Sequence, residues 1–313
     1  MPCLTGFAPP SGVYVAIEMK HESSLLSATW TIIWKSLLFL VLWGVLLAPF
    51  VIPIQARIPQ FHKDYPLQLQ LYFDAVSAVL VLAAAWIMVR FIDRRPFVTL
   101  GFVPEHWVRD VLAGAALGTL WLGISVLALW IMGFVSVLPW AGISLSVLCW
   151  AGAALVFNTV TQEVLVRSYI YQTIQSKANF VWAIVITSVI FMLFHAGALK
   201  GAILPVLNLF LAGVLFGVAR HRTGNLWLPI AIHFVWNFLL GPVLGLTVSG
   251  QDDLNSGWRM LVLKGPDLWT GGSFGLEGGL AVTIATALGA AAIFHFVRWD
   301  KTETASAAVP GGD

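Results

Sequence analysis

Long apolar runs recur along this chain, and their length constrains the fold more than any other feature. A helix rises about 1.5 Å per residue, so it needs about 20 apolar residues to cross roughly 30 Å of hydrocarbon. Runs of about this length occur at 33–54, 71–92, 109–135, 145–174, 180–199, 203–220, 227–246 and 278–298. We therefore expect an all-α, polytopic membrane protein with about eight transmembrane helices.

The composition excludes an ordinary soluble domain. Of the 313 residues, 59% are hydrophobic and 10% are charged, whereas soluble domains carry about 25% charged residues. The net charge is +2, and the basic residues are scattered between apolar runs instead of forming a patch for nucleic acid. Cys3 and Cys149 lie far apart, with no metal-ligand or redox spacing around either. The expected partner is the lipid bilayer, and nucleic acid is excluded.

The apolar runs divide the chain into three regions. We expect residues 1–32 to form an N-terminal cytoplasmic segment, 33–300 the transmembrane domain, and 301–313 a disordered tail rich in Ala, Gly and Pro. The first twenty residues lack the basic start and apolar core of a cleaved signal peptide. We expect the segment 93–102 to lie at the membrane surface and 249–275 to form an outer loop.

The distribution of Lys and Arg predicts the orientation in the membrane. With the N-terminus inside, 12 of the 17 basic residues fall on the cytoplasmic side and 5 on the other. Cytoplasmic loops carry the excess of basic residues in membrane proteins. We therefore expect a multi-pass protein of the bacterial inner (plasma) membrane with both termini in the cytoplasm.

The stretch from Gln162 to Arg167 places ionisable side chains inside the fourth apolar run. Of the fifteen acidic residues, only Glu163 is expected to lie deep in such a run. A charged group at the bilayer centre costs about 3 kcal/mol even on lenient insertion scales. Glu163 and Arg167 are four residues apart, so on a helix they share a face and can pair. A pair that simply holds a helix in place is the structural alternative.

Two further apolar runs carry polar side chains at a similar depth. His195 lies in the fifth run, and His233 and Asn237 share one helix face in the seventh. We take the centres of the three runs near residues 160, 190 and 237. Glu163 and these three residues then fall within roughly 8 Å of the bilayer midplane at a rise of about 1.5 Å per residue. The sequence therefore predicts a polar site between helices four, five and seven.

A carboxylate, two imidazoles and an amide around one cavity suit hydrolysis. The carboxylate and a histidine can deprotonate water, while the other groups stabilise the oxyanion that develops. Two histidines and a glutamate can also bind zinc, although the chain contains no HExxH spacing. We expect a site without a metal or other cofactor and keep zinc as the less favoured alternative.

The order QExxxR, FxxxH and HxxxN on separate runs, with RRPFVTLGF upstream, resembles the CPBP family. This family comprises the type II CAAX prenyl endopeptidase and Abi (bacteriocin-immunity) groups, and the resemblance covers about residues 90–245. It implies cleavage of a membrane-associated peptide or protein by water that a glutamate and the FxxxH histidine activate without a metal. The HxxxN residues would stabilise the oxyanion. Carried over to this chain, the catalytic residues are Glu163, His195, His233 and Asn237, with Arg167 as the ion-pair partner.

The chain departs from the family at one position. Family members have EExxxR and its first glutamate is regarded as the base, but this chain has Gln162 there, and an amide cannot take a proton from water. Glu163 is intact but turned by about 100° around the helix. Glu163 could turn to the cavity if the helix rotates or unwinds. Alternatively, His195 acts without its carboxylate, or the protein retains the fold without peptidase activity.

Two non-peptidase functions also remain open. A protein without peptidase activity would hold a membrane partner or confer bacteriocin self-immunity. A transporter with an intramembrane carboxylate for proton coupling is a further alternative. The absence of an internal repeat and the clustering of amide and imidazole groups disfavour transport.

Overall fold

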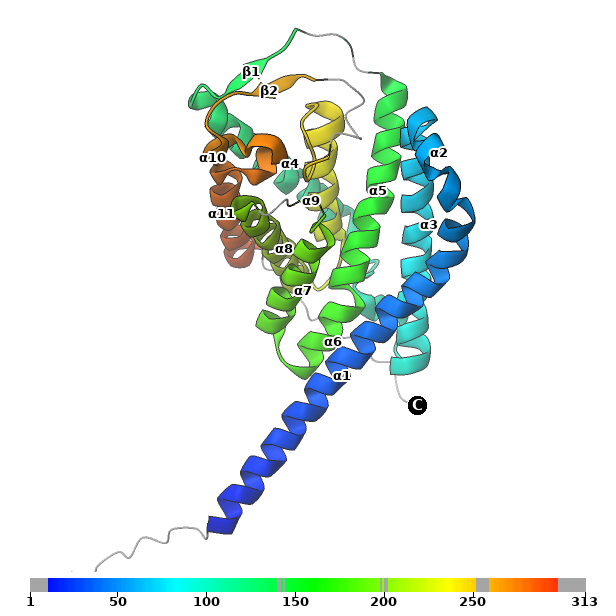
Figure 1. Cartoon of the computed structure of the whole chain (residues 1–313). Coiled ribbons are helices and arrows are strands. Elements are labelled where there is room, and N and C mark those ends of the chain that lie inside the picture. Colours follow the sequence, from blue (N-terminus) through cyan, green and yellow to red (C-terminus); the bar gives the residue numbers. More distant parts are fainter. Residues whose placement is uncertain are drawn as a thin grey trace, which may run out of the picture.

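The computed structural model describes residues 11–139, 142, 144–197, 199, 202–251 and 259–297, with side chains from residue 24 onward. Within these residues, five helices are long and apolar enough to cross a membrane, and three shorter apolar helices accompany them. The prediction of an all-α polytopic membrane protein is confirmed (Figure 1). The predicted tail at 301–313 lies outside the described residues.

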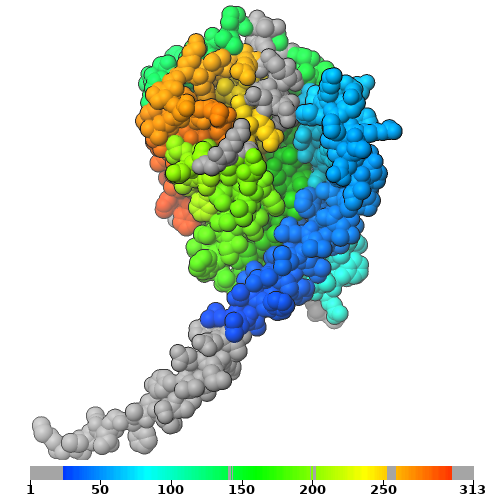
Figure 2. Space-filling view, in the orientation of Figure 1, coloured from blue at the N-terminus to red at the C-terminus, as the bar shows by residue number. Residues whose placement is uncertain are grey.

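The first two apolar runs form two long helices joined by short helical segments. The elements are α1 (Ser11–Val51), a 3-10 turn (Ile52–Arg57), α2 (Ile58–Asp64), α3 (Pro66–Ile87) and a π-helical turn (Met88–Asp93). Helix α1 starts well before the run that predicted it, so much of the expected N-terminal segment is helical. Figure 2 shows α1, in blue, lying over α3 and beside α6.

The third and fourth runs lie on either side of a short strand. Helix α4 (Trp107–Ile131) is followed by β1 (Val135–Val137), and the fourth run forms α5 (Leu145–Arg167) and α6 (Tyr169–Lys177). The break falls at Ser168, whose φ and ψ of −91° and −96° are not helical. The predicted run at 145–174 is therefore two helices, and the QExxxR motif ends at the break.

The remaining runs also form helices. They are α7 (Phe180–Phe194), α8 (Ile203–Thr223), α9 (Trp227–Phe238) with a π-helical turn (Leu239–Val243), and α11 (Leu280–Phe296). The Asn179 side chain caps α7 by accepting a hydrogen bond from the backbone N–H of Trp182 at 3.0 Å. Gly224, at φ 73°, ends α8 in the left-handed conformation that glycine adopts without strain.

A small two-stranded sheet closes one end of the helix bundle. Strand β1 pairs antiparallel with β2 (Leu261–Leu263), with Ser136 opposite Val262. Figure 1 shows this sheet at the end of the bundle opposite α6. The short helix α10 (Asp267–Thr270) and 3-10 turns at Gly272–Phe274 and Leu276–Gly278 follow. The predicted outer loop is therefore partly structured.

Two glycines bring α4 and α9 unusually close together. A Cβ atom on Gly114 would lie 2.8 Å from the backbone oxygen of Leu228, and one on Gly118 would lie 2.8 Å from that of Ile232. No side chain fits in such a gap, so the two helices touch through their backbones. Small residues allow this kind of contact between membrane helices.

The distribution of apolar and charged side chains between the surface and the interior is the reverse of that in a soluble protein. Large apolar side chains face outward, for example Trp30 (65% exposed) and Ile131 (74% exposed). Charged residues lie inside, among them Asp74, Asp110, Glu163, Arg167 and Arg220. Lipid favours apolar exposure and requires polar groups to be satisfied within the protein. This arrangement fits an integral membrane protein.

Candidate active site

Helix α5 supplies polar side chains to two different places. Its backbone is continuously helical from Leu145 to Arg167, so Gln162 and Glu163 point in directions about 100° apart. Glu163 faces a closed ion-pair cluster, whereas Gln162 lines a cavity. The explanation in which α5 rotates or unwinds to bring Glu163 to the cavity is therefore wrong for this structure.

The ion-pair cluster joins Glu163, Arg167 and His233. Glu163 Oε1 accepts a hydrogen bond from Arg167 Nη1 at 2.9 Å, and it lies 2.9 Å from His233 Nδ1. Glu163 and Arg167 have no exposed surface, and His233 is 4% exposed. The pairing predicted from the four-residue spacing is present, and it recruits the histidine of α9.

Aromatic rings and a backbone carbonyl complete the surroundings of Arg167. Its guanidinium carbon lies 4.8 Å from the centre of the Phe191 ring and 5.2 Å from that of Phe216. Arg167 Nη2 also donates to the carbonyl of Gly213 at 3.2 Å. Cation–π contacts of this kind strengthen when water is excluded. The cluster therefore fastens α5 to α7, α8 and α9.

The cavity has a volume of about 200 Å³ and lies beside this cluster. Its polar lining comprises Gln70, Asp74, Asn158, Gln162, His195, Asn237, Ser249 and Gln251. The expected convergence of α5, α7 and α9 is present here, and α3 adds two side chains that the sequence interpretation did not include. Of the predicted catalytic residues, His195 and Asn237 line the cavity, whereas Glu163, Arg167 and His233 do not.

His195 is oriented as a base would need to be. It lies at the C-terminal end of α7, because the helix ends at Phe194, before the predicted limit at residue 199. Its Nδ1 is 2.9 Å from the carbonyl of Phe191. A carbonyl only accepts hydrogen bonds, so Nδ1 must carry the proton. In the neutral ring Nε2 then keeps its lone pair and can accept a proton.

Helix α9 contributes one residue to the ion-pair cluster and one to the cavity lining. His233 joins the ion-pair cluster, while Asn237, one turn further on, lines the cavity. Asn237 is 6% exposed. Within the described part of the chain its amide makes no hydrogen bond to another residue, so its NH₂ group can donate to a ligand in the cavity.

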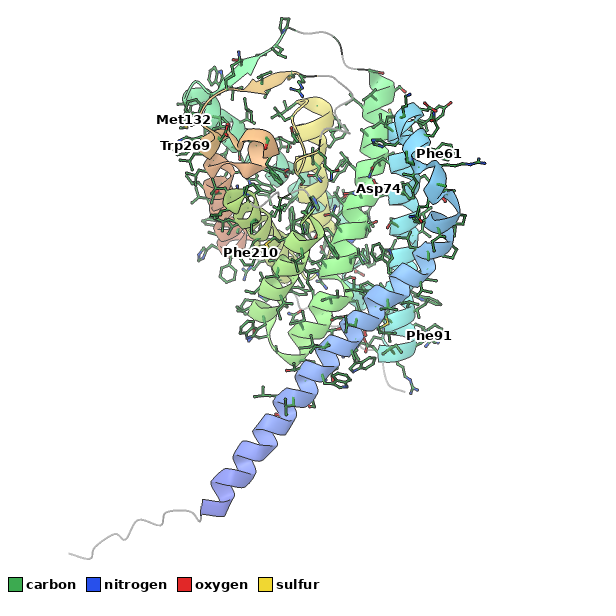
Figure 3. All side chains as sticks on the ribbon, in the orientation of Figure 1. Phe61, Asp74, Phe91, Met132, Phe210 and Trp269 are labelled. Atoms are coloured by element: carbon green, nitrogen blue, oxygen red, sulfur yellow. The ribbon has the colours of Figure 1, made fainter. Side chains whose placement is uncertain are left out.

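Asp74 on α3 is the cavity residue that the sequence interpretation missed. It accepts hydrogen bonds from Gln70 Nε2 at 2.7 Å and Asn158 Nδ2 at 3.0 Å, and the residue is 8% exposed. Figure 3 shows it between the ribbons of α3 and α5, whereas Phe61 and Phe91 point away from the bundle. The expectation that Glu163 is the one deep acidic residue is therefore wrong.

Asp74 was missed because the predicted start of the second apolar run lies too late in the sequence. The predicted run began at residue 71, which places Asp74 near its edge, but α3 starts at Pro66. Gln70 and Asp74 are four residues apart, as are Asn158 and Gln162. These two polar pairs at helical spacing in two apolar runs were the signal that could have identified Asp74.

The zinc alternative depends on ligand groups that lie close together. Among the described residues, no group of three His, Cys, Asp or Glu side chains could hold a metal ion. The polar side chains of the cavity lining are amides, one hydroxyl, one carboxylate and one imidazole. The expectation of a site without a cofactor stays a prediction.

Comparison with known proteins gives one match. Residues 143–239 match the family described as Type II CAAX prenyl endopeptidase Rce1-like. No curated protein and no solved structure matches the chain. The matched region runs from just before α5 to the end of α9 and contains all five predicted site residues, whereas α3 and Asp74 lie outside it. Residues 143–239 are thus similar to the type II CAAX prenyl endopeptidase Rce1-like family, and this segment contains the QExxxR, FxxxH and HxxxN motifs that carried the predicted resemblance.

Proposed function

We propose that this protein is an intramembrane endopeptidase, which hydrolyses a peptide bond of a membrane-associated peptide or protein with an activated water. The observation that carries the proposal is the polar cavity in which His195 and Asn237 meet, inside a bundle of apolar helices. The Rce1-like domain supports the same activity, because both residues belong to it.

The contacts suggest different roles for the five predicted residues. His195 Nε2 accepts a hydrogen bond from the attacking water and orients it, and the Asn237 amide donates to the oxyanion. Glu163, Arg167 and His233 are engaged with one another. We therefore assign them to holding α5 and α9 at the correct spacing, in place of the direct catalytic roles that the family resemblance implies for Glu163 and His233.

The test is an assay of the protein reconstituted in lipid vesicles. The probes are farnesylated and unmodified C-terminal peptides, and products are identified by mass spectrometry. Variants His195→Ala and Asn237→Ala should each lose about 10²-fold or more in kcat. Cys149→Ser, at an exposed position of α5, is the matched control and should retain activity. Undiminished cleavage in both alanine variants would remove the assigned roles.

A second function is favoured by one specific observation. Gln162 lines the cavity at the position where the resemblance places a basic glutamate, so the fold could serve to hold a membrane partner or to confer immunity to a secreted peptide. This alternative predicts that the wild type cleaves none of the peptides. The variant Gln162→Glu would then create cleavage that the wild type lacks.

A further inference from the structure

We propose that Asp74 of α3 is the carboxylate that takes the proton from the attacking water. It would supply the basic group that Gln162 cannot provide. This inference rests on the proposed endopeptidase activity, and it identifies a catalytic residue outside the segment that matches the family.

The first argument is location. Among the described residues that line the cavity, Asp74 is the one acidic side chain. Glu163 is the acidic residue of the QExxxR motif, but it does not line the cavity and its Oε1 is already held by Arg167 and His233. A base must reach the proton that it removes. By this criterion Asp74 qualifies and Glu163 does not.

The second argument is that Asp74 is held without being neutralised. Its two hydrogen bonds come from the side-chain amides of Gln70 and Asn158. Among the described residues, no Lys, Arg or His forms an ion pair with it. The two bonds engage one lone pair on each carboxylate oxygen, and each oxygen retains a second. The carboxylate is therefore oriented and still able to accept a proton.

The third argument is a chain of hydrogen bonds that leads to Gln162. An ionised carboxylate only accepts hydrogen bonds, so Asn158 must present its NH₂ group to Asp74 and its oxygen to the other side. That oxygen accepts from Gln162 Nε2 at 2.7 Å. The amide of Gln162 is thus oriented by Asp74 through Asn158, which joins the three residues into one unit.

The fourth argument is electrostatic. A glutamate at position 162 would place a second carboxylate on the same small cavity as Asp74. Two carboxylates that share a site resist being ionised together. Neutral Gln162 removes this conflict, so Asp74 can remain ionised. The neutral glutamine on α5 therefore suits the aspartate on α3. The one carboxylate of the cavity lining is carried by α3 instead of α5.

The resulting step conserves atoms and charge. As the water oxygen bonds to the carbonyl carbon, one O–H bond breaks and its proton passes to Asp74. The amide of Asn237 donates to the oxyanion. When the C–N bond breaks, Asp74 returns this proton to the leaving nitrogen. The products are an acid and an amine, and the carboxylate is regenerated.

The test moves the carboxylate between the two helices. Asp74→Asn keeps the size of the side chain and should lower kcat by about 10²-fold or more. Adding Gln162→Glu to Asp74→Asn restores a carboxylate on the other side of Asn158, and should recover at least tenfold of the loss. The matched control is Asp110→Asn, a buried aspartate that does not line the cavity, which should change kcat by less than threefold. Melting temperatures of all variants are measured in the same detergent.

The possible outcomes separate this inference from the proposed function. If the wild type cleaves and Asp74→Asn keeps kcat within threefold, Asp74 is not the base, but the endopeptidase activity stands. If Asp74→Asn is inactive and Gln162→Glu recovers nothing while the double variant melts like the wild type, the role of Asp74 is positional and the inference is overturned. If neither the wild type nor any variant cleaves, both proposals fail.

Discussion

The ion-pair cluster and the cavity both include side chains from the same stretch of α5, but their carboxylates have different kinds of partner. In the cluster, Glu163 Oε1 is paired with a guanidinium and an imidazole, and the residue has no exposed surface. In the cavity, Asp74 is held by neutral amides. The charged residues of the QExxxR motif, which are the most conspicuous in the sequence, therefore lie in the closed cluster. The less conspicuous amide side chains line the cavity, where a substrate has room to bind.

The comparison predicts that the largest effect comes from breaking the cluster. Arg167→Ala leaves Glu163 buried with its arginine removed, which should cost about 3–5 kcal/mol of unfolding free energy. The measurement is denaturant unfolding in detergent. Replacing the pair together, as Glu163→Leu with Arg167→Met, should recover most of the loss, because apolar residues of similar volume need no partner. A single variant that loses less than about 1 kcal/mol would show that the cluster does not hold the helices.

The two residues of α9 provide the sharpest separation between the groups. Asn237→Ala should lower kcat by about 10²-fold, equivalent to about 2.7 kcal/mol, because it removes the proposed oxyanion donor. His233→Ala should instead lower stability by about 2 kcal/mol, since it removes a buried partner of Glu163. Activity per folded molecule and melting temperature are measured for both. The comparison fails if both variants lose activity and stability in the same proportion.

A third prediction concerns the contact between α4 and α9, because α9 carries residues of both the ion-pair cluster and the cavity. Gly118→Val places side-chain atoms against the backbone of α9, where a Cβ alone would lie 2.8 Å from the oxygen of Ile232. Overpacking of this kind should cost about 1–3 kcal/mol. Gly123→Ala on the same helix is the control, because a Cβ there meets nothing within 4 Å. Equal melting temperatures for the two variants would contradict the backbone contact.

The smallest effect is expected from Glu277. This carboxyl is buried, as Glu163 is, but its hydrogen bonds come from neutral donors, as those of Asp74 do. It lies in the 3-10 turn before α11, where Trp236 Nε1 donates to Oε1 at 2.8 Å and the backbone N–H of Ser249 donates to Oε2. Burial raises the pKa of the Glu277 carboxyl above its usual range. The contribution of this group to stability is therefore fully present at acidic pH, below the pKa of an unfolded glutamate, about 4.3. It is lost as the pH rises through the raised pKa of the folded protein.

This pH dependence can be isolated with one substitution. Glu277→Gln should abolish that part of the fall in melting temperature between pH 5 and pH 8, a change of a few degrees. Asp267→Asn, at an exposed position in α10, should leave the pH dependence as it is. Identical pH curves for the wild type and Glu277→Gln would rule out this source.

The sequence predicted the helices well, because hydrophobic length is a local property. All eight apolar runs correspond to helices, and the four-residue spacing of Glu163 and Arg167 correctly indicated a shared face. The two-stranded sheet of β1 and β2 was not predicted. Its strands, Val135–Val137 and Leu261–Leu263, are three residues long and far apart in the chain, so periodicity gives no signal for their pairing.

The site was harder to predict, because periodicity fixes angles within a helix but not its rotation against its neighbours. Gln162 and Glu163 were equal candidates to face the cavity until packing on α7, α8 and α9 fixed α5. Asp74 was missed for the same reason, since nothing local to α3 indicates that Asn158 of α5 lies opposite. Contacts between helices are decided by tertiary structure, which one sequence does not display.

The glycine contact between α4 and α9 has a mechanical consequence. Two helices that touch through their backbones at Gly114 and Gly118 have no side-chain layer to compress or slide, so they move as one rigid body. His233 and Asn237 are therefore mounted on a stiff frame. An extended substrate that needs more room than about 200 Å³ would have to displace a wall of the cavity other than α9, namely α3, α5, the end of α7 or the segment 248–251.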